Sequence, residues 1–511
     1  MSDVHHPEYG EGEVVTYRRN GRVAIVDFDS RPMPTHVSTR ELIEVDGDEP
    51  GEADRSPSLL ERGGPAREGT RDRARSSRVL EAMRLGVVPD SNLDLYTVGR
   101  DVELSQIEAD LSRVQSSGGA VRAFLGDYGT GKTHLLRTVR ERALDEGYLV
   151  ADVTLDPRET PPSHPKRVYR AIVESLTYPD QPDADGRGLR PLFDRAAGDE
   201  AVRDQFDVRP SKGDRDERLE AGMHLYLTPA LLYYEQLTAD DPADELTDEI
   251  EADDVDRYVN NARSLLLEWI EGYPTISNRE INDQLSAVAG AHPWLYSLMD
   301  YRPWSRIYGY LISGIATLAR TTGYPGLILL VDEAERYSVL SKENREFARY
   351  LFKALSLATV GTEDVPFDRS ELTSLGGIGV LKELPPRYAD EPGLYTVLAM
   401  TPHDRGVDAL HEAVPPGKVC DLAPFDGRDY AELASKVCDF YASAHPDWEL
   451  PEAFVTRATS LLEDARDRGF VDSPRAAMKF LVEVLDIARL TPDDLDRVVR
   501  GVERRTTTFK R

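Results

Sequence analysis

An eleven-residue stretch, GDYGTGKTHLL at residues 126–136, has the spacing of a nucleotide phosphate site. Gly126, Gly131, Lys132 and Thr133 satisfy the pattern G-x-x-x-x-G-K-[ST]. In this pattern the glycines let backbone N–H groups surround the β-phosphate, the lysine reaches the β- and γ-phosphate oxygens, and the threonine hydroxyl contacts Mg²⁺. An apolar run follows, so the phosphates would lie at the positive end of a helix. The predicted ATP-binding residues are Gly126, Asp127, Tyr128, Gly129, Thr130, Gly131, Lys132, Thr133 and His134.

A second motif, LILLVDEAERY at residues 327–337, supplies the carboxylates that ATP hydrolysis requires. Its apolar residues predict a buried strand, and Asp332 emerges at the carboxyl end of that strand, where open α/β sheets bind ligands. We expect Asp332 to hold Mg²⁺ through water, together with Thr133. Glu333 is the expected general base that aligns the attacking water.

Four further residues refine this site. Thr401 ends a predicted strand, and it either contacts the γ-phosphate and the attacking water or caps the next helix. Arg475 begins a helix near the C-terminus, and it either reaches over the phosphates from a lid or is a surface arginine. Gly99 and Arg100, in the segment VGRDVE, are expected to precede the first strand of the sheet and to wall the adenine.

Other chemistry has less support. An arginine finger from a neighbouring subunit would come from Arg405, or from Arg345 or Arg349, and the sequence does not decide among them. His403 and His411 flank a short predicted helix, but neither cysteine nor a third histidine stands at metal-ligand spacing. A zinc site is therefore not expected.

A sheet with strands at 120–125 and in YLVADVTL, GLILLVDE, LYTVLAMT and KVCDLAPF must bring these residues together. Because the strands alternate with helices, we expect a mainly parallel α/β sheet of the P-loop type. The expected ATPase domain spans residues 76–427, with a helical insertion at about 161–320 and a loop at 362–392. Residues 428–511 show only helical patterns and are expected to form a lid.

The first 45 residues read as a separate all-β unit. GEVVTYRRNGRVAIVDFDS alternates apolar and polar residues, and Asn20-Gly21 is a hairpin signal. The unit, residues 1–45, resembles the small SH3- or tudor-like barrels of some helicases and transcription factors, which touch a polymerase or nucleic acid. Packing against its own chain is the alternative. Residues 46–75 form a Gly-, Pro- and charge-rich linker, whose arginines either contact phosphates or make a solvated arm.

The composition limits which partners can be inferred from the net charge. The net charge is −30, and lysines number 10 among the 62 basic residues. Such an acidic, lysine-poor chain is typical of salt-loving archaea, so acidity does not argue against nucleic acid. Cys420 and Cys438 are too few for a disulfide framework. With neither a signal peptide nor an apolar run of about 20 residues, we expect a cytoplasmic protein away from membranes.

The nucleotide-site residues together resemble the AAA+ ATPases, in particular the archaeal Orc/Cdc6 initiators, over about residues 95–490. This resemblance implies a sheet of order 5-1-4-3-2 and a helical lid. The chain departs from that pattern in its long insertion between the second and third strands. It also has no room after the lid for the winged-helix DNA-binding domain of the initiators.

A second resemblance covers most of residues 76–490. SRVLEAMRLGVVPD, the segment LGDYGTGKTHLLRTVRERALDEGYLVADVTL, and DPRETPPSHPKRVYRAIVESL are similar to the ATP-binding proteins of bacteriophage-exclusion (BREX) defence loci. The residues that carry this likeness include Glu159, Thr160, Pro161, Val168, Tyr169 and Arg170. The resemblance implies antiviral defence beside a helicase or methyltransferase.

We therefore expect a Mg²⁺-dependent ATPase that couples ATP to assembly or remodelling on duplex DNA. A slow nucleotide-gated switch that binds a partner protein is the alternative, and an initiator relative is a third reading. Whether the chain forms a homo-oligomer stays open.

Overall fold

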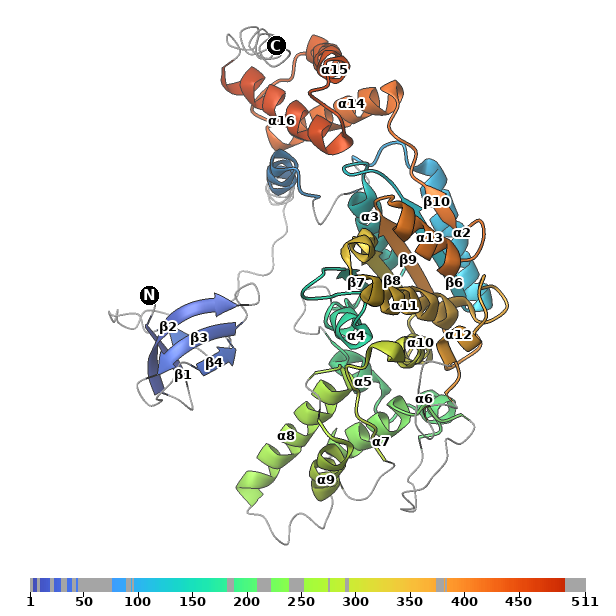
Figure 1. Ribbon diagram of the computed structural model, residues 1–511. Coiled ribbons are helices and arrows are strands. Elements are labelled where there is room, and N and C mark those ends of the chain that lie inside the picture. The colour runs from blue at the N-terminus through green and yellow to red at the C-terminus, as the bar shows by residue number, and fades with distance from the viewer. Residues whose placement is uncertain are drawn as a thin grey trace. The chain divides into compact units, whose positions relative to one another are not determined.

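The chain divides into two compact units, Met1–Glu68 and Gly69–Arg511. The computed structural model (Figure 1) describes the strands that lie between residues 3 and 44, and then most of the larger unit. In that unit it describes residues 76–88, 93, 96–181, 188–208, 222–238, 252–273, 276–289, 294–373, 381 and 384–491.

The smaller unit is an antiparallel sheet. Its strands are β1 (Asp3–His6), β2 (Gly10–Arg18), β3 (Val23–Phe28), β4 (Thr35–Ser38) and β5 (Ile43–Glu44). They pair in the order β4-β3-β2-β1-β5, and the pairing of β2 with β3 shifts register between Val14 and Thr16. The hairpin residues Asn20 and Gly21 and the linker 46–75 lie outside the described residues. The likeness to SH3 or tudor barrels remains a prediction.

The larger unit is built on a five-stranded parallel sheet, which confirms the expected α/β class. Its strands are β6 (Gly119–Leu125), β7 (Leu149–Thr154), β8 (Leu327–Asp332), β9 (Leu394–Met400) and β10 (Val419–Asp421). They lie in the order β10-β6-β9-β8-β7, and every pairing is parallel. Counted along the chain within this sheet alone, the order reads 5-1-4-3-2. Every residue of β6 and β9 is buried, as expected for central strands of a parallel sheet.

Helices cover both faces of this sheet. One face packs against α2 (Asp101–Ser117) and α3 (Lys132–Asp145). The other packs against α4 (Pro165–Glu174), α10 (Ser305–Thr321), α11 (Lys342–Val360) and α13 (Asp404–Ala413). The short α12 (Ser370–Thr373) follows α11, and the 3₁₀ segment η4 (Ala334–Val339) follows β8. The loops that carry the predicted site, after β6 and after β8, therefore each follow a buried strand.

The described residues between 161 and 320 are mostly helical. After α4 come α5 (Arg190–Ala196), α6 (Glu200–Phe206), α7 (Leu227–Thr238), α8 (Ala252–Ile270), α9 (Asn278–Ala289) and the 3₁₀ turn η3 (Arg302–Trp304). Their apolar side chains join the same core as α10 and the sheet. Helix α10 is buried from Ser305 to Ala319, so it lies between the insertion helices and the sheet.

Three C-terminal helices occupy the region predicted to be a lid, and we call them the lid helices: α14 (Gly427–Ala444), α15 (Glu452–Asp467) and α16 (Pro474–Leu490). They share a separate apolar core with a helix at residues 76–85, through Val79, Leu80 and Met83. Sequence reasoning grouped this N-terminal helix with the ATPase domain, because the packing partner of an amphipathic helix is not encoded locally. The domain boundaries themselves remain predictions.

Candidate nucleotide-binding site

The glycine-rich loop joins the end of β6 to the first turn of α3. Gly129 and Gly131 have φ angles of 81° and 100°, in the left-handed region that glycine adopts without strain. The ammonium of Lys132 donates hydrogen bonds to the carbonyl oxygens of Gly126 (2.7 Å) and Asp127 (3.1 Å). The lysine therefore lies across the loop, and burial lowers its pKa against the opposing effect of nearby carboxylates, with Glu335 first among them.

The carboxyl end of β8 reaches the start of α3. The hydroxyl of Thr133 donates to Asp332 Oδ2 at 2.8 Å, although the two residues are 199 positions apart. Their oxygens suit Mg²⁺, which prefers oxygen ligands and takes few from protein because phosphates and water complete its shell. Within the described residues, no group of three or more His, Cys, Asp or Glu side chains is placed to hold a metal ion.

Glu333, directly after β8, has a strained backbone. Its φ of 58° is left-handed, and its N–H donates to Asp332 Oδ1 at 2.8 Å. Its carboxylate pairs with Arg336 at 2.8 Å. Burial, followed by the charge of Glu335, raises the pKa of Glu333.

Thr401 lies at the end of β9 and is held by a residue that sequence reasoning missed. Glu335 accepts a hydrogen bond from the hydroxyl of Thr401 (2.5 Å) on one carboxylate oxygen and from its N–H (3.0 Å) on the other. Thr401 does not cap α13 with its side chain, since the helix starts after His403 without a side-chain cap. The spacing D-E-x-E is visible in the sequence, but Thr401, the partner of Glu335, lies 66 residues further along the chain.

The start of α16 contacts the phosphate loop. Arg475 donates a hydrogen bond to the hydroxyl of Tyr128 at 2.8 Å, and its guanidinium lies 5.2 Å from the centre of that ring. Ser473 is so close to Gly129 that a β-carbon on the glycine would lie 2.8 Å from the Ser473 Cβ. The lid and the phosphate loop are therefore in direct contact.

A pocket runs from the loop to the lid. The predicted residues that line it are Arg100, Tyr128, Gly129, Thr130, Gly131, Lys132, Thr133, His134, Glu333 and Arg475. Gly126, Asp127, Asp332, Thr401 and Gly99 do not line it. Its apolar end includes Val98, from the segment predicted to wall the adenine, and four side chains that sequence reasoning missed: Val88, Tyr96, Leu433 and Met478. They come from the segment before α2 and from two lid helices, so no local motif unites them.

Arg100 connects this pocket to the chain between β10 and α14 rather than projecting freely into it. The side chain is buried, with one N–H donated to the carbonyl of Thr130 (2.6 Å) and another to that of Ala423 (3.0 Å). The guanidinium also lies 5.1 Å from the ring centre of Phe425. Arg100 therefore ties the phosphate loop to the chain between β10 and α14.

The three candidate finger arginines differ in their contacts. Arg345 donates to the carbonyl of Leu340, and Arg349 pairs with Glu412 at 3.3 Å. Arg405 is exposed and, within the described part of the chain, has no polar partner. His403 and His411 are both exposed.

A parallel sheet whose first strand runs through a glycine-rich loop into a helix defines the P-loop architecture of α/β proteins. The family model of the BREX system ATP-binding protein BrxC/D matches residues 72–351, more than half of the chain. The chain therefore belongs to this family, which supports ATP binding and a role in BREX defence with other proteins of that system. The matched region includes the glycine-rich loop, Asp332 and Glu333.

Among the curated proteins, none matches the chain. No helix in the described ranges is long and apolar enough to cross a membrane.

Proposed function

We propose that the chain is a Mg²⁺-dependent ATPase of the AAA+ type that couples ATP binding and hydrolysis to assembly or remodelling on DNA during BREX defence. The observation that carries this proposal is the meeting of Lys132, Thr133, Asp332 and Glu333 at one edge of the sheet. The proposed partners are duplex DNA, a helicase or methyltransferase of the same system, and further copies of the chain.

In the proposed mechanism, the phosphates of ATP lie at the N-terminus of α3. Lys132 exchanges its bonds with the loop carbonyls for the β- and γ-phosphate oxygens. Thr133 and Asp332 would hold the magnesium ion, which neutralises charge on the phosphates. Glu333 orients the attacking water, and its raised pKa makes its carboxylate a stronger proton acceptor. Arg475 gives up its hydrogen bond to the Tyr128 hydroxyl and contacts the γ-phosphate instead.

A nucleotide-gated switch is the second candidate, and the ion pair between Glu333 and Arg336 favours it. A carboxylate that is engaged by an arginine is less available to a water molecule, so turnover would be slow until a partner displaced Arg336. The switch would bind a partner protein and would not respond to DNA.

Steady-state ATP hydrolysis in molar KCl, with and without duplex DNA, separates the two candidates. Lys132→Ala and Glu333→Gln are the inactive controls. Turnover that rises with DNA and is lost in both variants supports the DNA-coupled ATPase. Tight ATP binding with negligible turnover under both conditions refutes it and leaves the switch.

A further inference from the structure

Glu335 and Thr401 form a closed pair between the loop after β8 and the end of β9. Both carboxylate oxygens of Glu335 are engaged by Thr401, at 2.5 Å by the hydroxyl and at 3.0 Å by the backbone N–H. A carboxylate that accepts two donors from one residue is held in position and direction. The pair thus fixes η4 to the strand that neighbours β8 in the sheet.

This pairing changes the role of Thr401. A hydroxyl has one proton to donate, and Thr401 gives it to Glu335. While that bond persists, the hydroxyl cannot donate to a γ-phosphate oxygen. Thr401 is therefore an anchor for Glu335 in this state of the protein.

Glu333 needs such an anchor nearby. In the described part of the chain, only Glu333 and Asp207 have a left-handed backbone without being glycine. A strained backbone of this kind persists only where the surrounding structure enforces it. The residue after it, Ala334, is fully buried, and the next, Glu335, is bound to Thr401. These contacts hold the start of the short η4 turn, directly after Glu333.

We propose that Glu335 is a positioning residue for hydrolysis: by gripping Thr401 it holds Glu333 in the backbone conformation that brings its carboxylate to the pocket. The proposal rests on the proposed ATPase function. Glu333 lines the pocket and Glu335 does not, which assigns the contact with water to Glu333 and the support to Glu335.

The test measures kcat and the ATP dissociation constant of the full chain carrying Glu335→Ala or Thr401→Val. We expect each variant to lose at least 10-fold in kcat while ATP affinity stays within threefold, because the phosphate contacts of Lys132 and the loop are unchanged. The double variant should lose no more than either single one. Glu335→Gln, which keeps one acceptor for the hydroxyl, should fall between wild type and Glu335→Ala. The control is Glu363→Ala, which removes an exposed carboxylate and should leave kcat unchanged.

The Glu333→Gln background separates positioning from structural damage. If Glu335 acts through Glu333, adding Glu335→Ala to Glu333→Gln should not lower the residual rate further. A kcat within twofold of wild type in Glu335→Ala would overturn the proposal, as would an equal loss in the Glu333→Gln background.

Amide hydrogen exchange across residues 333–339 gives a second readout that does not need turnover. Glu335→Ala should speed exchange there at least 10-fold, and unchanged exchange would contradict the inference. An inactive wild type with fast exchange in Glu335→Ala would refute the ATPase function while leaving the anchor intact.

Discussion

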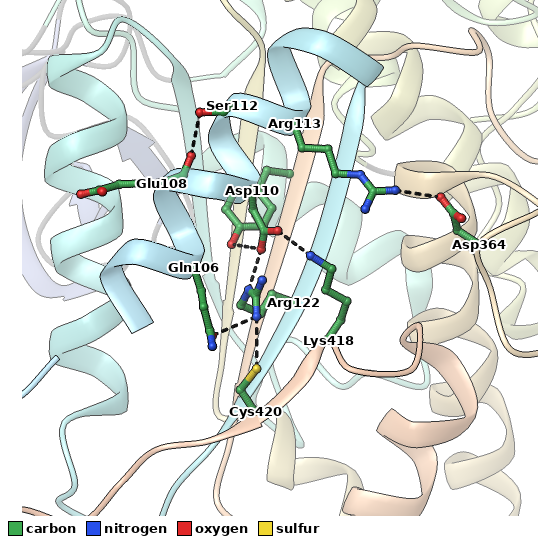
Figure 2. A network of polar contacts seen from close by, with 10 residues as sticks. Gln106, Glu108, Asp110, Ser112, Arg113, Arg122, Asp364, Lys418 and Cys420 are labelled. Atoms are coloured by element: carbon green, nitrogen blue, oxygen red, sulfur yellow. Dashed lines mark hydrogen bonds and ion pairs between the residues drawn. The ribbon is translucent and has the colours of Figure 1, made fainter. Parts of the chain in front are cut away.

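A buried charge network behind the phosphate loop makes a quantitative prediction about the sheet (Figure 2). Asp110 of α2 is 2% exposed and Arg122 of β6 is 5% exposed. Asp110 accepts hydrogen bonds from Arg122 Nε (2.5 Å), Lys418 Nζ (2.6 Å) and the Tyr395 hydroxyl (3.1 Å). Arg122 also contacts Cys420 Sγ at 3.1 Å. One carboxylate therefore ties α2 to β6, β9 and the segment that enters β10.

Replacing Asp110 with alanine leaves Arg122 buried without its counter-charge. Removing one partner of a buried ion pair costs about 3–5 kcal/mol. Three donors lose their acceptor, which raises the cost within this range. The Lys418 side chain is 24% exposed and regains water, which lowers it. We expect a loss of about 4 kcal/mol in the stability of the β6–β10 pairing, which is a factor of roughly 700 at about 1.4 kcal/mol per tenfold.

Hydrogen exchange measured by mass spectrometry on peptides that contain β6 and β10 checks this value in the full chain. The matched control is Asp364→Ala, which breaks an ion pair with Arg113 whose side chains are 44% and 51% exposed. Exposed pairs contribute about 0–1 kcal/mol, so exchange should change less than about fivefold. Adding Arg122→Met to Asp110→Ala should recover part of the loss, because no charge is then buried alone at that position. Exchange in Asp110→Ala that stays within tenfold of wild type would refute the reasoning.

Two further predictions concern a histidine and a glycine. Burial lowers the pKa of His224 from 6.5 to about 3, so below pH 6.5 the unfolded chain binds a proton that the folded chain does not. The stabilisation from neutral His224 is fully present well above pH 6.5, and it should fall by about 2 kcal/mol between pH 7 and pH 5. The measurement is the difference in unfolding free energy between wild type and His224→Gln at the two pH values. A difference that stays constant with pH would contradict the prediction. Gly131→Ala places a side chain at φ 100°, at a cost of about 1–2 kcal/mol, and should weaken ATP binding at least 10-fold in a calorimetric titration. Gly417→Ala, at φ 78° with no atom within 4 Å of the added carbon, should be similarly strained but bind ATP normally; equal affinities in the two variants would refute a special role for Gly131.

The parts of the site that the sequence predicts are those that depend on neighbours along the chain. The glycine-rich loop needs left-handed backbone at Gly131 and a helix directly after it, and both requirements appear within a few residues. Asp332 follows a run of apolar residues that can only be a buried strand in this context. The meeting of Thr133 with Asp332 then follows from the parallel sheet, since the carboxyl ends of all its strands lie at one edge and α3 packs against β8.

The parts that the sequence does not predict depend on contacts across long separations. Thr401 is of a residue type that can contact a γ-phosphate, but Glu335 accepts the only proton that its hydroxyl can donate. Arg475 faces the loop, where the exposed Tyr128 binds it. Neither competitor follows from a motif, because each is an ordinary residue type whose effect arises only from geometry.

The N-terminal segment of the larger unit makes long-range contacts of this kind with both the nucleotide pocket and the lid helices. Arg84 donates two hydrogen bonds to Asp486 of α16, at 3.0 and 2.8 Å, so the helix at 76–85 is held to the lid. The residues that follow it, Val88 and Tyr96, line the nucleotide pocket. This segment therefore packs against the lid helices through Arg84 and lines the pocket through Val88 and Tyr96.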